Sequence, residues 1–338
     1  MPAADQNSDF DLSLIIICRN SMEVLPHCVG AVQPLMMQGE LRVECLVVDM
    51  DSADGSQDYL AAERDRWHIS GFVSETLTNR FEAMNRGLQL AQGRVCLFIT
   101  PETELMVENT AACCAPILRG EAECVFSTAV QVNPDNGRHR PQTPNPEHLF
   151  LRTPCHHAAF FCATSLLRRL GGFDWQRYPA LADVDMMHRV LAADAAYRVA
   201  SLSTCRQYLR PEREEHEELH VDFLRFIASH REEILMQCKA HPSYAVRTVH
   251  EILRHAVRCD WPVPGDTPVV IDALLRELSG VIRPIIRRKI IRRLRTRAIT
   301  QAILIPFKGL RRARITRKLV RSHFHVARLL GLESIVAK

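Results

Sequence analysis

Acidic side chains follow two apolar segments in the first third of the chain, at the point where each segment ends. Asp49 and Asp51 come directly after the run 43–48, and Glu102 and Glu104 follow the run 94–99. Short apolar runs of this kind are typical of strands that are buried on both faces of a parallel sheet. Such sheets bind their ligands at the carboxyl ends of their strands, so these carboxylates are candidates for binding a ligand or a metal ion.

A second group of reactive side chains lies near the middle of the chain. It contains the pair His156 and His157 and, further along, the pair Asp183 and Asp185. A carboxylate can accept a proton from a hydroxyl group, and a histidine can bind a phosphate or exchange a proton near neutral pH. Structural interpretations stay open as well, because the aspartates can cap a helix beginning near Val184 and the histidines can stabilise the local fold.

Short apolar runs alternate with segments of helical periodicity over the first hundred residues. This alternation predicts a doubly wound, mostly parallel α/β sheet. The expected strands cover residues 12–17, 43–48, 71–74 and 94–99, and the expected helices cover 23–37, a segment that begins at Asp54 or Ser56, and 80–91.

The composition changes along the chain and indicates three parts. Turn-forming residues dominate 133–146, which predicts a surface loop, and charged helical segments are expected at 212–238 and 245–258. We therefore expect an α/β domain over residues 1–210, a helical extension over 211–280 and a basic amphipathic tail over 281–338.

The overall composition is that of a globular protein, with 47% hydrophobic and 24% charged residues. There is no amino-terminal signal sequence and no run of roughly 18 apolar residues, which favours a cytoplasmic protein placed peripherally at the inner face of the membrane. The 12 cysteines include no C-x-x-C pair, so buried, reduced thiols are expected rather than disulfides or a zinc site.

Basic residues are concentrated near the carboxyl end. Residues 281–328 contain 16 Lys and Arg and no Asp or Glu, whereas residues 1–280 carry 26 basic against 38 acidic residues. Apolar residues recur at helical spacing between the arginines, which is typical of a helix that binds an anionic membrane surface. Two alternatives remain open. The tail can dock on the acidic body or on another copy, or it can bind nucleic acid, which the acidic body and the lack of interleaved aromatic residues disfavour.

Four segments of the chain, in the right order, resemble family 2 glycosyltransferases of the GT-A fold, especially bacterial enzymes of exopolysaccharide and lipopolysaccharide assembly. The segment 12–20 is similar to the family's opening strand and T-x-N turn, and 46–60 is similar to V-V-D-x-x-S-x-D-G-T. Residues 72–105 are similar to D-A-M-N-x-G, A-x-G and a strand that ends in an acidic motif. Residues 156–190 are similar to H-Q-A-x-F, L-G-G-F-D and A-D-Y-D-L-W-x-R.

The resemblance implies an enzyme that moves a sugar from a nucleotide-diphosphate donor of the UDP or GDP type to a saccharide or lipid-linked acceptor, with inversion. A carboxylate must take the acceptor's proton, and a cation or basic groups must stabilise the departing diphosphate. Asp183 falls where the family keeps its general base, and Asp185 lies two residues beyond it. The implied nucleotide-sugar site comprises Arg19, Asp49, Asp51, Arg80, Thr100 and Glu102, and the implied acceptor side comprises His156 and His157.

The chain departs from the family pattern at one functional position. The family usually carries D-x-D or N-x-D after the fourth strand to hold Mg²⁺ or Mn²⁺, and this chain has Thr100, Pro101 and Glu102 there. Glu102 is the remaining candidate ligand, because Mg²⁺ binds with one or two carboxylates plus phosphate oxygens.

The alternative function is a catalytically decayed GT-A-like binding or scaffold protein. A nucleotidyltransferase is disfavoured, since no Gly-rich basic loop follows the first strand.

Overall fold

The computed structural model describes residues 8–146, 150, 153–208, 217–259 and 265–281. The chain divides into two compact units, Met1–Arg213 and Glu214–Lys338. The basic tail expected from residue 281 onwards lies outside the described residues beyond Val281, so its helical character stays a prediction.

One mixed sheet forms the centre of the first unit. Its strands are Leu12–Cys18 (β1), Val43–Asp49 (β2), Gly71–Ser74 (β3), Val95–Ile99 (β4), Thr103–Leu105 (β5), Cys124–Asn133 (β6), Arg138–Gln142 (β7), Phe160–Ala163 (β8) and Tyr197–Tyr208 (β9). Over the described residues the strand order is β3-β2-β1-β4-β8-β6-β9-β5, with β7 paired to β6. The first four strands in this order are parallel, and β8 runs antiparallel to both of its neighbours. The carboxyl ends of β1, β2 and β4 therefore meet at one edge.

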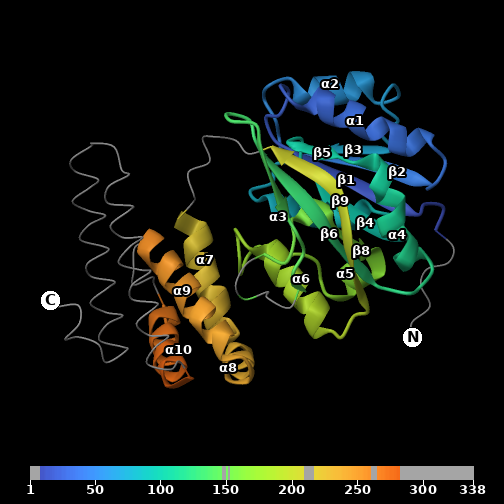
Figure 1. Ribbon diagram of the computed structural model, residues 1–338. Coiled ribbons are helices and arrows are strands. Elements are labelled where there is room, and N and C mark those ends of the chain that lie inside the picture. The colour runs from blue at the N-terminus through green and yellow to red at the C-terminus, as the bar shows by residue number, and fades with distance from the viewer. Residues whose placement is uncertain (1–7, 147–149, 151–152, 209–216, 260–264, 282–338) are drawn as a thin grey trace. The chain divides into compact units, whose positions relative to one another are not determined.

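Helices cover both faces of this sheet (Figure 1). One face packs against Leu25–Met37 (α1), Ser56–Glu63 (α2) and Thr110–Leu118 (α4), and the other packs against Arg80–Leu90 (α3), Thr164–Arg169 (α5) and Ala182–Ala192 (α6). Together with the carboxyl-terminal helices, this arrangement confirms the expected α/β class.

Alternate residues of β1 enter the two cores that these helices form. Leu14 and Ile16 lie in one core, Ile15 and Ile17 lie in the other, and none is more than 3% exposed. Burying a side chain of this size stabilises the fold by roughly 1.5–3 kcal/mol. This two-sided burial explains why β1 is a continuous apolar run rather than an alternating one.

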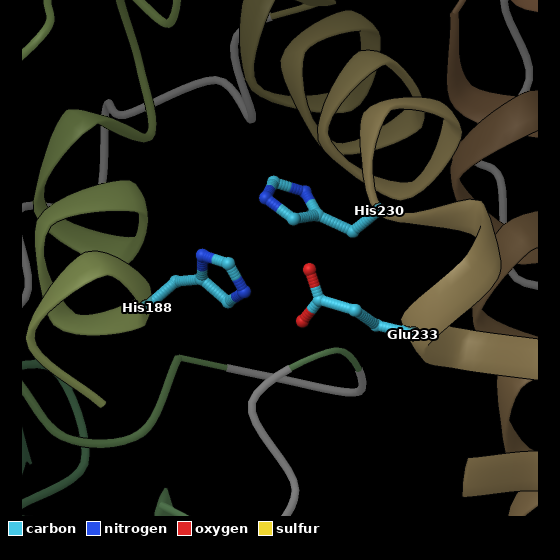
Figure 2. A group of neighbouring side chains, drawn as sticks. All are labelled: His188, His230 and Glu233. Carbon is cyan, nitrogen blue, oxygen red and sulfur yellow. The ribbon is translucent and has the colours of Figure 1, made fainter. Parts of the chain in front are cut away.

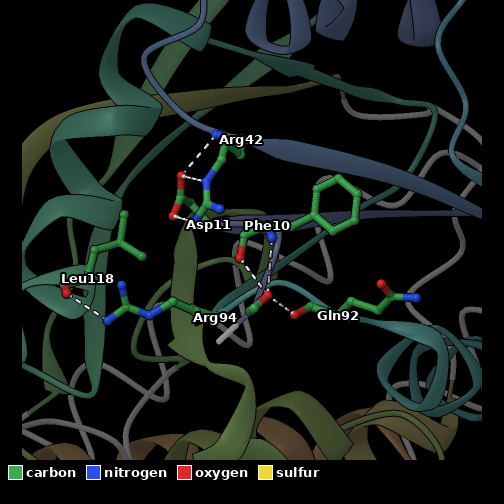
Figure 3. Close-up of polar contacts among 7 residues, drawn as sticks. Phe10, Asp11, Arg42, Gln92, Arg94 and Leu118 are labelled. Atoms are coloured by element: carbon green, nitrogen blue, oxygen red, sulfur yellow. Dashed lines mark hydrogen bonds and ion pairs between the residues drawn. The ribbon is translucent and has the colours of Figure 1, made fainter. Parts of the chain in front are cut away.

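Polar contacts tie together the amino ends of the central strands (Figure 3). The guanidinium of Arg42 donates to both carboxylate oxygens of Asp11, at 2.8 and 3.2 Å. The Arg94 side chain donates to the carbonyl of Leu118 at 2.7 Å, and its backbone N–H donates to the carbonyl of Phe10 at 3.1 Å. These contacts lie at the edge opposite the acidic residues that follow β2 and β4, so they serve the fold.

Two expected elements differ from the structure. The turn-rich segment 133–146 is a hairpin rather than a loop throughout, because residues 138–142 pair with β6 as β7. Its turn is confined to a few residues, where the Asn133 side chain accepts the N–H groups of Asp135 and Asn136. The helix expected at 212–238 is two helices.

The second unit is helical over its described residues. It consists of Glu217–Ser229 (α7), Arg231–Ala240 (α8), Pro242–Arg258 (α9) and Thr267–Val281 (α10). His230 separates α7 from α8, and its ring nitrogen Nδ1 lies 2.8 Å from the carbonyl of Phe226. Glu233 follows in the first turn of α8 (Figure 2, which also draws His188 of α6). Within the described part of the chain, no helix has the length and apolarity needed to cross a membrane.

A buried histidine pair links α7 to α9. The Nδ1 atoms of His220 and His255 lie 2.9 Å apart, so one ring donates and the other accepts. The ring of Phe223 stacks on His255 at 3.9 Å. Burial, reinforced by the charges of His220, Arg254 and Arg258, lowers the pKa of His255 from 6.5 to about 2. His220 also ends the pattern H-E-E-L-H, a spacing known from zinc helices, but His216 lies outside the described residues.

We expect the free energy of unfolding to fall below pH 6.5, because unfolded His255 takes up a proton that the folded pair excludes. The loss is about 2 kcal/mol between pH 6.5 and pH 5. Urea unfolding followed by circular dichroism at pH 7.5 and pH 5 measures it. The variant His255→Gln keeps an amide for His220 and removes this contribution, so an equal loss in wild type and variant would contradict the assignment.

Candidate functional site

The loops after β1 and β2 are joined by reciprocal hydrogen bonds. The backbone N–H of Asn20 donates to Ser52 Oγ at 2.7 Å, and the N–H of Ala53 donates to the Asn20 side chain at 2.9 Å. Asn20 has a φ of 46°, a left-handed conformation that asparagine tolerates better than most residues. Asp54 adds a third link by accepting the N–H of Met22 at 2.8 Å. These links between the loops were not predicted from the sequence.

Asp49 is fully buried at the end of β2, and its carboxylate is occupied by the surrounding loop. It accepts the backbone N–H of Ser52 at 3.0 Å, the hydroxyl of Ser52 at 2.5 Å and the hydroxyl of Ser74 at 2.7 Å. The Cys18 thiol lies 3.5 Å from the same carboxylate. These contacts make Asp49 the residue that holds the β2 and β3 ends in register.

Asp51 differs from Asp49 in exposure and in backbone conformation. It is solvent-exposed, has a φ of 56°, and accepts one hydrogen bond, from the Thr76 hydroxyl at 2.9 Å. Arg19, which follows β1, is exposed as well. Asp51 and Arg19 are therefore the predicted nucleotide-site residues that this edge leaves open to solvent.

The turn after β4 carries the degenerate metal motif. Thr100 Oγ1 lies 3.5 Å from Thr103 Oγ1, and Glu102 is half-buried with its carbonyl accepting the N–H of Tyr208 at 3.2 Å. Glu104 points to other partners, since it pairs with Arg206 and accepts the Tyr208 hydroxyl.

A metal at this turn would depend on the diphosphate for most of its ligands. Among the described residues, Glu102 belongs to no group of three His, Cys, Asp or Glu side chains whose ligand atoms lie together. One carboxylate beside a threonine hydroxyl fits Mg²⁺ or Mn²⁺ only in company with diphosphate oxygens and water. Glu102 and Thr100 are the residues that would hold it.

The loop before α6 is clamped by side chains from α3 and α6. Asn85 on α3 donates to the carbonyl of Phe173 at 2.8 Å and accepts its N–H at 2.7 Å. Arg189 on α6 donates to the carbonyls of Leu170 and Gly172 at 2.6 and 2.7 Å. Gly172 has a φ of 74°, and a Cβ placed there would lie 2.4 Å from the Asn85 side-chain oxygen. Neither clamp was predicted from the sequence.

The two aspartates predicted at the start of α6 have different partners. Asp185 is buried and pairs with Arg189 at 2.7 Å, so it orients the arginine that clamps the preceding loop. Asp183 lies in the first turn of α6, where its Oδ1 accepts the N–H of Val184 at 2.9 Å. Its Oδ2 lies 3.7 Å from Nδ1 of His157. The helix itself begins at Ala182, without a side-chain cap.

Asp183 stays ionised although it is buried. Burial alone raises the pKa of its carboxyl. The side-chain contact with His157 and the electrostatic influence of Arg80, His157 and His156 outweigh burial, and the pKa falls below its ordinary value of 3.8. Arg80 extends from the first turn of α3, with its guanidinium 4.6 Å from the ring of Phe81. The structure therefore brings together Asp183, His157 and Arg80 from three separate segments.

Residues 13–174 match the family described as Glycosyl transferase family 2. The chain thus carries a family 2 domain of the GT-A fold, and this family consists of nucleotide-sugar glycosyltransferases. No curated protein sequence matches the chain.

Solved structures with the same fold include TarS from S. aureus. TarS 1–349 in complex with UDP is 14% identical, with a TM-score of 0.55, over 96% of this chain and 90% of that one. Against a longer TarS chain the same alignment covers 54% of the relative. GalNAc-T7 with UDP, GalNAc and Mn²⁺ is 15% identical, with a TM-score of 0.51, over 66% of this chain and 48% of that one. At these identities the likeness shows the fold alone.

Gly171 and Gly172 give a matched test of the loop before α6. Both have positive φ, but a Cβ at Gly171 meets nothing within 4 Å, whereas one at Gly172 collides with Asn85. We expect Gly171→Ala to cost about 1 kcal/mol of unfolding free energy from backbone strain alone. Gly172→Ala should cost about 1–3 kcal/mol more, because it also breaks the Asn85 clamp. Urea unfolding of both variants measures the difference, and equal losses would show that the clamp is unimportant.

Proposed function

We propose that this protein is an inverting glycosyltransferase in which Asp183 is the general base. The acceptor hydroxyl oxygen attacks the anomeric carbon of the donor sugar, and the bond from that carbon to the diphosphate oxygen breaks. Asp183 takes the hydroxyl proton, and the nucleoside diphosphate leaves with the bonding electrons. A base of this kind contributes about 10²–10⁴-fold to the rate.

The single observation that carries this proposal is the placement of Asp183, which is buried in the first turn of α6 with its Oδ2 atom 3.7 Å from Nδ1 of His157. A buried carboxylate with a lowered pKa is ionised at neutral pH and ready to accept a proton. Its location on α6 places it among the family segments that the Asn85 and Arg189 clamps hold in place. An aspartate that served only to begin the helix would need neither His157 nor the charge of Arg80.

On the donor side, we propose that Arg19, Asp51 and Arg80 contact the nucleotide, while Asp49 shapes the loop that receives it. TarS has been solved with UDP and with UDP-GlcNAc, which supports a UDP-type donor as the first candidate. If Mg²⁺ or Mn²⁺ accompanies the diphosphate, Glu102 and Thr100 would hold it, and the metal would neutralise negative charge on the leaving group.

The alternative proposal is a binding or scaffold protein that retains the nucleotide site without turnover. One observation favours it. The position of the first acid in the metal motif is occupied by Thr100, and among the described residues Glu102 belongs to no group of three side chains that could hold a metal ion. Nucleotide binding and catalysis must therefore be measured separately.

We expect Asp183→Asn to lower the release of UDP from UDP-GlcNAc, or of GDP from a GDP-sugar, by about 10²–10⁴-fold. The amide is close in shape to the carboxylate but cannot take the proton. Nucleotide release in the presence of candidate acceptors, with and without Mn²⁺, measures the change.

Calorimetric titration of wild type and Asp183→Asn with UDP and GDP is the control, and both proteins should bind equally. Equal turnover in the two proteins would contradict the role of Asp183. Binding without turnover in the wild type across all donors would instead favour the scaffold function.

The acceptor is proposed to be a saccharide or lipid-linked saccharide of polysaccharide assembly, reached by a peripheral protein at the inner membrane face. The support is the charge distribution, with 16 basic and no acidic residues in 281–328. Each basic residue near an anionic leaflet contributes about 1 kcal/mol to binding. Docking of the tail on the acidic body is the competing possibility.

We expect the full-length protein to float with vesicles that contain anionic lipid and not with neutral vesicles. Replacing four arginines of the tail with serine should abolish flotation at physiological salt, because the electrostatic attraction is lost. The four are Arg287, Arg288, Arg292 and Arg293. A control replaces Arg138 and Arg140, which lie on the exposed strand β7. Unchanged flotation of the tail variant would end the membrane proposal.

A further inference from the structure

His157 and Asp183 form a buried pair between two segments that are distant in sequence. Nδ1 of His157 lies 3.7 Å from Oδ2 of Asp183, and the residues are 8% exposed each. His157 begins the short 3-10 helix His157–Ala159 that leads into β8, and Asp183 lies at the start of α6. The contact therefore depends on the packing of the whole α/β unit.

The backbone that carries His157 is fixed on both sides. The side chain of His156 accepts the N–H of Ala158 at 3.2 Å, and the carbonyl of Ala159 accepts the hydroxyl of Ser127 on β6 at 2.9 Å. The rings of His156 and His157 lie against each other with centroids 4.1 Å apart. These contacts hold the imidazole of His157 in one place beside Asp183.

The second ring nitrogen of His157 shows how the pair is protonated. Nε2 is buried and has no hydrogen-bond partner among the residues that the structure describes. An N–H there would be a buried, unsatisfied donor, whereas a bare lone pair costs less, so the proton belongs on Nδ1 and faces the carboxylate. A buried Nε2 is also closed to an acceptor hydroxyl, which argues against His157 as the base itself.

We infer that His157 is a positioning residue for Asp183, holding its carboxylate oriented and ionised through the Nδ1–H group. The inference rests on the proposed function and gives the proposed base a partner, in the way that a carboxylate and an imidazole orient each other in other enzymes. The catalytic residue, in contact with the substrate, remains Asp183.

Electrostatics around the pair supports this role. Arg80 faces Asp183 from α3, His156 and His157 face it from the segment before β8, and Cys155 lies close enough for the Asp183 charge to help raise its pKa. On α6 itself, Asp185 is engaged with Arg189. Removing His157 leaves the burial of Asp183 opposed mainly by Arg80 and His156, so the pKa of Asp183 should rise toward or above its ordinary value.

The test compares His157→Leu with His157→Asn in the full-length protein. Leucine removes the donor and keeps the bulk, whereas the asparagine amide restores an N–H close to the position of Nδ1. The pKa of Asp183 is measured by carbon-13 NMR of protein labelled at the aspartate carboxyl carbons, with the signal assigned from Asp183→Asn. This readout needs no substrate.

We expect the pKa of Asp183 to rise by about one unit or more in His157→Leu and to return most of the way in His157→Asn. His139→Leu, on the exposed strand β7, should leave it unchanged. In turnover assays, the acid limb of kcat should move up with the pKa in His157→Leu while KM for the donor stays the same. An unchanged or lowered Asp183 pKa in both His157 variants would overturn the inference.

The failure of the proposed function is a separate result. If the wild type binds no nucleotide and turns over no donor, but the pKa of Asp183 still responds to His157, the pair is real and the enzymatic role is wrong. If turnover depends on Asp183 but the pKa of Asp183 does not change in the His157 variants, the enzymatic function is supported and the positioning role of His157 is wrong.

Discussion

Burying a carboxylate while keeping it ionised is the strictest requirement in the α/β unit, because burial in a low dielectric penalises the charged form. The residues that satisfy this requirement at Asp183 come from segments that are distant in the sequence. Arg80 comes from α3 and His157 from the approach to β8, while Asn85 and Arg189 hold the loop that leads into α6. The apolar packing of α3, α5 and α6 on one face of the sheet is therefore a precondition for the charged state of Asp183, as well as a source of stability.

The sheet could be predicted from the sequence because its signals are local. Runs such as 12–17 and 43–48 are apolar throughout, since residues on both faces are buried, and the structure confirms strands there with boundaries extended by one residue. The hairpin of β6 and β7 could not be predicted in the same way. Residues 138–141 are exposed and include no large apolar side chain, and 138–142 become a strand only because β6 provides backbone hydrogen-bond partners across the turn. The break between α7 and α8 at His230 could not be predicted either, because no glycine or proline occurs there.

The candidate site was predictable as a region and less so as a set of interactions. Family-like segments located the loops after β1, β2 and β4 and the start of α6. Asn20, which joins the loops after β1 and β2, and Asn85, which binds the loop before α6 to α3, lie inside those segments, but no role was predicted for them because such hydrogen bonds have no sequence period. Both are asparagines, which can donate and accept at once. An asparagine inside a motif at a strand end is a signal that could have been used.

Hydrogen-bond saturation separates acids that the sequence presents as equivalent. Asp49 accepts three hydrogen bonds from Ser52 and Ser74, and Asp185 is paired with Arg189 at 2.7 Å, so both carboxylates are engaged by the fold. Asp51 accepts one hydrogen bond from Thr76 at the surface. Asp183 accepts one from Val184, and its other oxygen lies 3.7 Å from His157, a contact longer than a hydrogen bond, so that oxygen retains acceptor capacity. Asp51 and Asp183 are thus the acids most available for ligand binding. This distinction follows from the hydrogen-bond partners of the four aspartates and not from their spacing in the sequence.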